Sequence, residues 1–285
     1  MSVASNIRIV SKYFTTNDGV RLHYLEAGAG RPLVLVHGIS QTAEQFKFQI
    51  EALGDRYRVI ALDLRGHGES DKPDFGLKIH RLAQDLREAL VAANARDVVL
   101  LGHSMGSSVI WAYWELFGAD RLGKIVLIDE PAMLTANPAW TAEEVEAAGP
   151  IHTPASLWET ANALPGPNGE AIFRAFMDRL VTKNCPEDLK QWMLRCSART
   201  ARKDVATLLL NHGCLDWRDI IPRISLPTLV IGGRASLIPW KSIAWIARQI
   251  PGAQLEIFEE NERGSHFMFV ENPTKFNQIV STFVG

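Results

Sequence analysis

The sequence has little of what marks several large classes of protein. Its three cysteines form an odd set without the spacing of a metal site. We expect them to be buried structural thiols. No apolar run is long enough to cross a bilayer. The first residues, MSVASNIRIVSKYF, have neither the apolar stretch nor the cleavage site of a signal peptide. The three cysteines are Cys185, Cys196 and Cys214.

An excess of charge of one sign is also missing. The formal net charge is -2 at pH 7, and basic and acidic residues are interspersed along the chain. Such a chain has no field that would attract nucleic acid or an anionic membrane. We therefore expect a cytoplasmic protein without either partner. Its 285 residues suffice for one large domain or for a core with an inserted subdomain. The oligomeric state stays open, and a homodimer is one option.

Short apolar segments alternate with a helical pattern in the first half of the chain. The segments PLVLVHG, YRVIALDLRG, DVVLLGHS and KIVLIDEPA are typical of strands buried on both faces. Before them, the Asn-Asp-Gly sequence at 17–19 predicts a hairpin. Between the second and third segments, Leu82, Leu86 and Leu90 lie on one face of a predicted helix. This alternation predicts an α/β fold with a mostly parallel, doubly wound sheet.

The strand signal then disappears and later returns. Short helical segments, TAEEVEAAG, NGEAIFRAFMDRLVTKN and PEDLKQWMLRCSART, follow one another and are punctuated by proline and glycine. The α/β pattern resumes with LPTLVIGG, WKSIAWIARQI, AQLEIFEE and NPTKFNQIVSTFV. We therefore predict a core in two parts, 1–132 and 220–285, with a helical cap inserted at 133–219.

One motif carries a specific chemical signal. Gly102-His103-Ser104-Met105-Gly106 follows a predicted buried strand and precedes a predicted helix. A G-x-S-x-G sequence at a strand-to-helix turn predicts a nucleophile elbow, in which a strained backbone exposes the serine hydroxyl. The alternative is a glycine-rich turn whose serine only caps the helix.

Three further motifs occur in a fixed order around this elbow. His37-Gly38 ends a predicted strand, DLRGHGESDKP occupies 63–73, and GSHFMFVENPTKF occupies 264–276. With these four motifs the chain resembles the α/β-hydrolase-fold family. It is most similar to the esterases, lactonases, cofactor-free haloperoxidase-type perhydrolases, epoxide hydrolases and haloalkane dehalogenases of that family. The resemblance covers essentially the whole core, and implies a helical cap at the insertion and no metal or organic cofactor.

The resemblance assigns roles to several residues of this chain. Epoxide hydrolases and haloalkane dehalogenases carry an aspartate at the elbow, whereas this chain has Ser104, which favours attack on acyl carbons. The family's oxyanion donors correspond to the backbone amides of Ile39 and Met105. His266 is the expected base, because it alone among eight histidines follows the last predicted strand in a glycine-containing loop. A surface histidine is the alternative.

Three other histidines have less specific interpretations. The side chain of His103 should point away from the elbow, so a packing role is favoured. His67 lies within the D-x-R-G-H-G turn and is interpreted as structural. His212 is expected either to line the cavity under the cap or to serve only at the end of a helix.

The acid that should orient His266 is missing from its usual place. The family most often carries it after the strand TLVIGG, where this chain has Ser236, and 220–255 contains no carboxylate. In zearalenone lactonases and some haloalkane dehalogenases the acid instead ends the strand after the nucleophile helix. That strand here ends in Asp129 and Glu130. Asp129 is preferred, because it falls on the acid position of these relatives when the chain is aligned on Arg121-Leu122 and the strand. Glu130 is one residue off, and neighbouring side chains alternate along a strand, but both stay candidates. A dyad without an acid is the third option.

These residues predict a serine hydrolase that cleaves a carboxylic ester or lactone through an acyl-enzyme. Perhydrolysis or carbon–carbon bond hydrolysis would use the same residues, and a ligand receptor on a hydrolase fold is the alternative from another class. The cap is rich in large apolar residues, which favours a moderately large apolar substrate. We expect most of them to form the cap's own core and a few to face the elbow, with Trp240 as a further wall. The cap residues are Trp140, Trp158, Phe173, Phe176, Met177, Trp192 and Met193.

Overall fold

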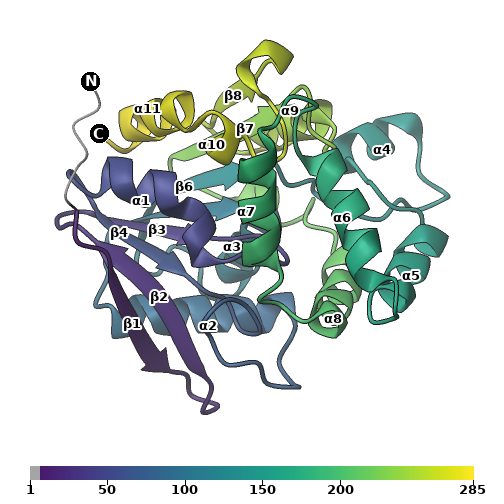
Figure 1. The fold of residues 1–285 in the computed structure, drawn as a ribbon. Helices are drawn as coiled ribbons and strands as arrows, with labels where there is room; N and C mark the ends of the chain where they lie inside the picture. The colour runs from purple at the N-terminus through teal and green to yellow at the C-terminus, as the bar shows by residue number, and fades with distance from the viewer. Residues whose placement is uncertain (1–6) are drawn as a thin grey trace.

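An eight-stranded sheet with helices on both faces organises the chain (Figure 1). The structure, a computed structural model, describes residues 7–285. The first six residues, part of the stretch in which no signal peptide is expected, lie outside the described residues. The strand order is β1-β2-β4-β3-β5-β6-β7-β8. Strand β2 runs antiparallel to β1 and β4, and the other pairs are parallel. The predicted fold class is thus confirmed.

The elements follow the predicted alternation of strands and helices. The strands are β1 (Val10–Thr15), β2 (Arg21–Ala27), β3 (Pro32–Val36), β4 (Arg58–Leu62), β5 (Val98–His103), β6 (Leu122–Ile128), β7 (Thr228–Gly233) and β8 (Gln254–Phe258). The α-helices are α1 (Lys47–Leu53), α2 (Ile79–Ala92), α3 (Met105–Phe117), α4 (Ala142–Ala148), α5 (Pro154–Ala163), α6 (Gly169–Leu180), α7 (Glu187–Ser197), α8 (Arg202–Gly213), α9 (Trp240–Gln249), α10 (Met268–Glu271) and α11 (Pro273–Val284). Three 3₁₀ turns are η1 (Ala43–Phe46), η2 (Ile221–Arg223) and η3 (Glu260–Glu262).

The central strands are apolar throughout because both faces of the sheet are covered. In β3, Val34 and Val36 belong to one apolar cluster, together with residues of α2, α3 and α9. Leu33 and Leu35 point the other way, into a cluster with α1, α10 and α11. Figure 1 shows α2 on one side of the sheet and α1 with α11 on the other. Alternating side chains of one strand therefore serve two cores.

The predicted hairpin joins the first two strands. β1 and β2 pair with Thr15 opposite Arg21, and the turn between them contains Gly19 with a φ of +84°. A positive φ at this point is the conformation that glycine adopts at low cost. The hairpin extends the sheet on the side of the molecule away from α4, α5 and α6 (Figure 1).

The chain between β6 and β7 is helical. Within the described residues, 129–227 contribute α4 to α8 and η2, and no strand of the main sheet. Figure 1 shows α4, α5, α6 and α8 together at one side of the molecule, with α7 nearer its middle. Some of their apolar side chains, such as Phe173 and Met177, lie in the same cluster as Phe267 of the core. The segment therefore packs directly on the core, and its predicted limits at 133 and 219 stay a prediction.

The expectation that all cysteines are buried is wrong. Cys196 is buried, Cys185 is half-buried and Cys214 is exposed, and all three are free thiols. Cys214 directly follows the last turn of α8, where the chain reaches the surface. A helical pattern around a cysteine does not tell which face of the helix it occupies.

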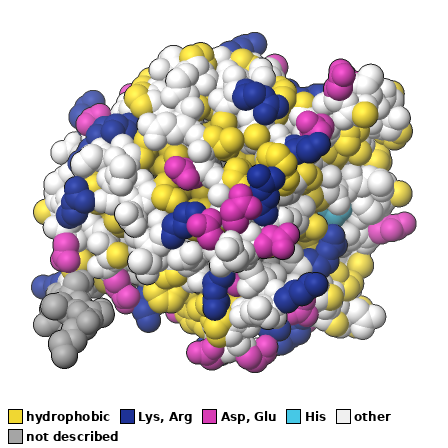
Figure 2. All heavy atoms as spheres, turned by 90° about the horizontal axis from the view of Figure 1, so that it is seen from above, with side chains coloured by type: hydrophobic (Ala, Val, Ile, Leu, Met, Phe, Trp, Pro, Cys, Tyr) yellow, Lys and Arg dark blue, Asp and Glu magenta, His cyan; other side chains and the backbone are white. Residues whose placement is uncertain are grey.

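The surface and the helices add two observations. On the face shown in Figure 2, Lys and Arg side chains are interspersed with Asp and Glu side chains. No helix within 7–285 is long and apolar enough to cross a membrane.

Candidate active site

The G-x-S-x-G motif forms a sharp turn between β5 and α3. Ser104 lies between them with φ 52° and ψ -131°, a strained conformation for a residue other than glycine. The two flanking glycines are required because a side chain at either position would clash with the neighbouring backbone. A Cβ atom on Gly102 would lie 2.5 Å from the carbonyl oxygen of Gly106, and one on Gly106 would lie 2.2 Å from that of Val36. The turn thus places Ser104 at the carboxyl end of the sheet and at the start of a helix.

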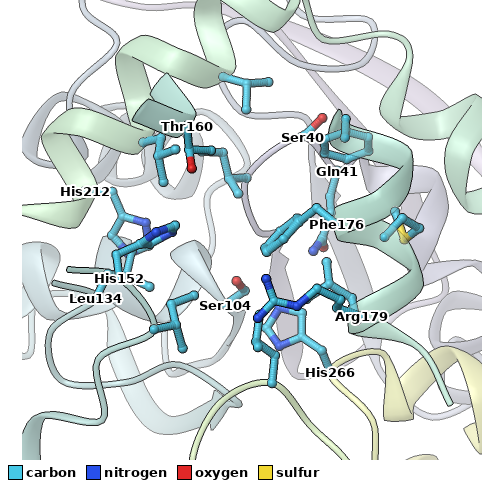
Figure 3. A pocket seen from close by; sticks show the side chains of 18 of the residues that line it. Ser40, Gln41, Ser104, Leu134, His152, Thr160, Phe176, Arg179, His212 and His266 are labelled. Atoms are coloured by element: carbon cyan, nitrogen blue, oxygen red, sulfur yellow. The ribbon is translucent and has the colours of Figure 1, made fainter. Parts of the chain in front are cut away.

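His266 lies in the loop after β8 and contacts a carboxylate. Its Nδ1 is 2.7 Å from Oδ2 of Asp129. Because a carboxylate only accepts, Nδ1 carries the hydrogen and the other ring nitrogen, Nε2, is left as an acceptor. His266 and Ser104 face the same cavity (Figure 3). The two side chains are not hydrogen-bonded to each other in this structure, and such contacts often tighten only when a substrate is bound.

Asp129 directly follows β6 and is completely enclosed. Its backbone has a φ of 50°, and its amide donates to the carbonyl of Ile231 in the neighbouring strand at 2.8 Å. Burial raises the pKa of Asp129, whereas the contacts with His266 and Ser236 act in the opposite direction. The Ser236 hydroxyl donates to the same carboxylate oxygen that His266 contacts. Ser236, at the family's usual acid position, thus contacts the carboxylate rather than the imidazole.

Glu130, the other candidate acid, contacts a different histidine. Its Oε1 lies 2.6 Å from Nε2 of His212 and 3.0 Å from the hydroxyl of Ser108. Consecutive residues at the end of a strand project to different sides, so the two carboxylates reach two different imidazoles. Of the pair, Asp129 is the one in contact with His266.

The two amides expected to bind an oxyanion are free. Neither the amide of Met105 nor that of Ile39 donates to another atom of the described chain. Met105 is the first residue of α3, where helical geometry leaves the amide without a partner. Ile39 lies in a loop whose next residue, Ser40, has a φ of 56°. Both amides therefore lack a partner within the described chain, and of the two residues Ile39 lines the cavity.

His67 and His103 hold the loops around Ser104. His67 Nδ1 donates to the carbonyl of Arg65 at 2.9 Å, and Nε2 accepts from the amide of Ser40 at 3.2 Å. His103 is fully buried, as expected, and its Nε2 lies 2.8 Å from the carbonyl oxygen of His266. This contact ties the elbow to the histidine loop, a link that the sequence did not predict.

Acid pH is expected to destabilise the fold through these buried imidazoles. Burial lowers the pKa of His67 to about 3, from 6.5 in an exposed chain, and it also lowers the pKa of His37 and His103. Between these two pH values the unfolded chain binds a proton that folded His67 does not. The free energy of unfolding should therefore fall as the pH drops below about 6.5. Urea unfolding at several pH values measures this slope. His67→Gln should reduce it by about one proton, and an unchanged slope would contradict the assignment.

A cavity of about 350 Å³ lies in front of Ser104. Ser104 lies between His266 on one side and His212 with His152 on the other (Figure 3). No group of three His, Cys, Asp or Glu side chains within 7–285 could hold a metal ion. The cavity is lined by Ile39, Ser40, Gln41, Ser104, Glu130, Leu134, Ile151, His152, Thr160, Leu164, Ile172, Phe173, Ala175, Phe176, Met177, Arg179, Leu180, Val205, Leu209, His212, Leu237, Ile238, His266 and Phe267.

We expected most of the large apolar cap residues to form the core of the cap and Trp240 to be a wall of the cavity, and this expectation is partly wrong. Phe173, Phe176 and Met177 line the cavity. Trp158 is 56% exposed and so is not part of a core. Trp240 is not a wall of the cavity, because its ring packs under the guanidinium of Arg234 at 3.8 Å.

Some residues of the cavity were missed because nothing nearby in the sequence marks them. Arg179 lies on α6, and His152 precedes α5, in a region read only as helical. The apolar pattern of α6 could have indicated that its buried face meets the cavity. It could not have shown which polar residues flank that face.

Comparisons with known proteins agree with this architecture. The model of the alpha/beta hydrolase family matches residues 33–279. The non-heme chloroperoxidase CPO-A1 of Kitasatospora aureofaciens is 29% identical over 281 residues, which cover 95% of this chain and 98% of that protein. The 3-oxoadipate enol-lactonase 1 of Acinetobacter baylyi is 30% identical over 242 residues, which cover 83% of this chain and 82% of that protein.

A solved structure shares the fold. The esterase of Exiguobacterium antarcticum superposes with a TM-score of 0.87 at 24% identity, covering 97% of this chain and 100% of that one. The relatives thus include a chloroperoxidase and an enol-lactonase, which supports hydrolase activity, whereas the esterase structure shows the shared fold. Because the family match spans nearly the whole core, the chain belongs to the alpha/beta hydrolase family.

Proposed function

We propose that the protein is a serine hydrolase that cleaves a carboxylic ester or lactone through an acyl-enzyme on Ser104. The observation that carries this proposal is the contact of 2.7 Å between His266 and Asp129, on the cavity that the strained Ser104 also faces. An oriented imidazole on the same cavity as a serine hydroxyl is the arrangement that activates a serine for acyl transfer.

The proposed reaction uses each of these groups once in each half. Ser104 Oγ attacks the acyl carbon while its proton passes to Nε2 of His266. Asp129 stabilises the resulting imidazolium, and the amides of Ile39 and Met105 donate to the oxyanion. His266 then protonates the leaving alcohol. In the second half, His266 takes a proton from water and the hydroxide attacks the acyl carbon. The bond from that carbon to Ser104 Oγ then breaks, His266 returns the proton to Oγ, and the carboxylic acid is released.

The cavity favours an apolar substrate of moderate size. Its walls carry Phe173, Phe176 and Met177 from α6 and Leu237 from the loop after β7. Large apolar walls with few polar groups are typical of sites that bury most of an organic ligand. We infer that the helical segment 133–219 acts as a lid that covers this cavity and excludes water from the acyl-enzyme.

Perhydrolysis is a second candidate, because one relative is named a non-heme chloroperoxidase. In that reaction hydrogen peroxide, instead of water, attacks the acyl-enzyme and releases a peracid. Assaying peracid formation from a short carboxylic ester in the presence of hydrogen peroxide distinguishes the two outcomes. The receptor alternative rested on a missing acid, and the contact of Asp129 with His266 removes that argument.

Covalent labelling tests the proposal most directly. An organophosphonate probe should react with Ser104, because the neighbouring imidazole raises the nucleophilicity of the hydroxyl. Mass spectrometry of the digested protein should place the adduct on the peptide that carries Ser104. Ser104→Ala is the control and should abolish the adduct. An adduct elsewhere in wild type, with Ser104 unmodified, would overturn the proposed mechanism. A burst of product with a chromogenic ester would separate an enzyme from a receptor.

A further inference from the structure

A second carboxylate–imidazole pair lies across the cavity from His266. Glu130 Oε1 contacts His212 Nε2 at 2.6 Å and the hydroxyl of Ser108 at 3.0 Å. The side chains of Glu130 and His212 are only 2% and 4% exposed. The proposed reaction gives this pair no role, although Glu130 and His212 both line the cavity.

The hydrogen bonds fix how His212 presents its second nitrogen. The carboxylate of Glu130 can only accept, so Nε2 carries the hydrogen when the ring of His212 has a single one. Nδ1 is then an acceptor, and it is buried without a hydrogen-bond partner within 7–285. A buried acceptor that makes no hydrogen bond is unfavourable, which makes it a candidate for a ligand contact.

The position of His212 is suited to such a contact. His212 and His152 lie on the side of Ser104 opposite His266 (Figure 3). His212 ends α8, Glu130 follows β6 and Ser108 lies in α3, so three elements fix the ring. A polar acceptor held in place in a largely apolar wall is a specificity feature typical of small-molecule sites.

The surrounding charges indicate which donor this acceptor can take. The Glu130 carboxylate directly behind the ring disfavours an anionic group. Burial lowers the pKa of His152, and the Arg179 guanidinium is close enough to lower it further, so a cationic group is disfavoured as well. A carbonyl group has no hydrogen to donate. The donors that remain are neutral hydroxyl and N–H groups, and we take a hydroxyl as the donor to be tested.

We propose that His212, held by Glu130, accepts a hydrogen bond from a hydroxyl group of the substrate. The substrate class is therefore a largely apolar ester or lactone with a hydroxyl group remote from the scissile carbonyl. This inference rests on the proposed acyl transfer at Ser104 and narrows its substrate.

A purely structural role for the pair would also hold the three elements together, so the test must separate the two roles. p-Nitrophenyl esters of six- to ten-carbon acids, each with a methyl or an ω-hydroxymethyl terminus, are compared for kcat/KM. The ratio of the two values on one preparation does not depend on how much enzyme is active. A mutation that only destabilises the fold lowers both values and leaves the ratio unchanged.

At one chain length, wild type should prefer the hydroxylated ester by about 3- to 10-fold, the size of one net hydrogen bond. His212→Phe should reduce this ratio to one or below, while His212→Gln, which keeps an acceptor oxygen, should retain part of it. Glu130→Gln permits the other imidazole tautomer and should lower the ratio as well. Thr160→Val, which removes another polar group from the cavity wall, is the matched control and should leave the ratio unchanged.

The outcomes separate the two proposals. If the esters are not hydrolysed and the phosphonate does not label Ser104, the acyl-transfer function itself fails. If the esters are hydrolysed but the wild-type ratio is near one at every length, only the role of His212 is overturned. A preference that survives His212→Phe but disappears in Thr160→Val would assign the contact to Thr160 instead and would also overturn it.

Discussion

Ser104→Ala is expected to lower kcat for a chromogenic ester by about 10⁴- to 10⁶-fold, with a much smaller effect on KM. The reason is that the hydroxyl forms the covalent intermediate, whereas the cavity walls that bind the ester are untouched. Steady-state kinetics with a p-nitrophenyl ester measures the change. Residual activity should come from the free amides of Ile39 and Met105 acting on bound ester and water.

A serine outside the cavity provides the control for this result. Ser281 lies on α11 and bonds to Arg56, so Ser281→Ala should leave kcat within about twofold of wild type, as expected for a substitution away from the site. Thermal unfolding of both variants shows whether the fold is retained. If Ser104→Ala keeps activity within tenfold of wild type, a nucleophile other than Ser104 must be responsible.

Asp129→Asn is expected to lower kcat by about 10²- to 10⁴-fold without loss of the fold. An asparagine amide can donate to Nδ1 of His266, which favours the tautomer with its hydrogen on Nε2, and it cannot neutralise the imidazolium. In wild type the buried carboxylate of Asp129 lies 2.7 Å from Nδ1 of His266. The substitution removes both its control of the tautomer and its stabilisation of the imidazolium. The rate of burst product formation with a chromogenic ester isolates this effect on chemistry from product release.

The neighbouring residues supply the comparison variants. Glu130→Gln should reduce kcat much less, because Glu130 contacts His212 and not His266. Ser236→Asp in the Asp129→Asn protein should restore part of the rate, since it returns a carboxylate to the family's usual position. Full activity of Asp129→Asn with an inactive Glu130→Gln would mean that the other carboxylate is the functional one. If both single variants stay active, His266 works without a carboxylate from this strand.

The sheet could be predicted from the sequence because strands that are buried on both faces consist of continuous apolar residues. Continuous apolar segments marked β3, β4, β5 and β6, and the glycines at Ser104 marked a turn that tolerates no larger neighbour. Asp129 was preferred over Glu130 because it falls on the acid position of the resembled family, and because consecutive side chains of a strand point to opposite sides, which disfavours its neighbour. These inferences depend on local geometry, which neighbouring residues determine.

Contacts between distant parts of the chain could not be predicted in this way. Glu130 and His212 are 82 residues apart, and His103 lies 163 residues from the carbonyl of His266 that it contacts. Each contact depends on how helices pack on the sheet, which periodicity does not fix. Trp240 was misplaced for the same reason, since its partner, Arg234, lies across a loop whose path was unknown.

The place where the helical segment joins the sheet bears on protein engineering. The chain leaves β6 after Ile128 and re-enters β7 at Thr228, and these two strands are hydrogen-bonded neighbours. Because the two strands are parallel, the chain leaves at the carboxyl end of β6 and returns at the amino end of β7, where Thr228 pairs with Ile125. Asp129 directly follows β6 and precedes the first helix, α4. We expect that helices α4 to α8 can be exchanged as a unit with those of another member of the fold while Ser104, His266 and Asp129 stay in place. Such a chimaera would replace the walls that select the substrate and keep the residues proposed to carry out the chemistry.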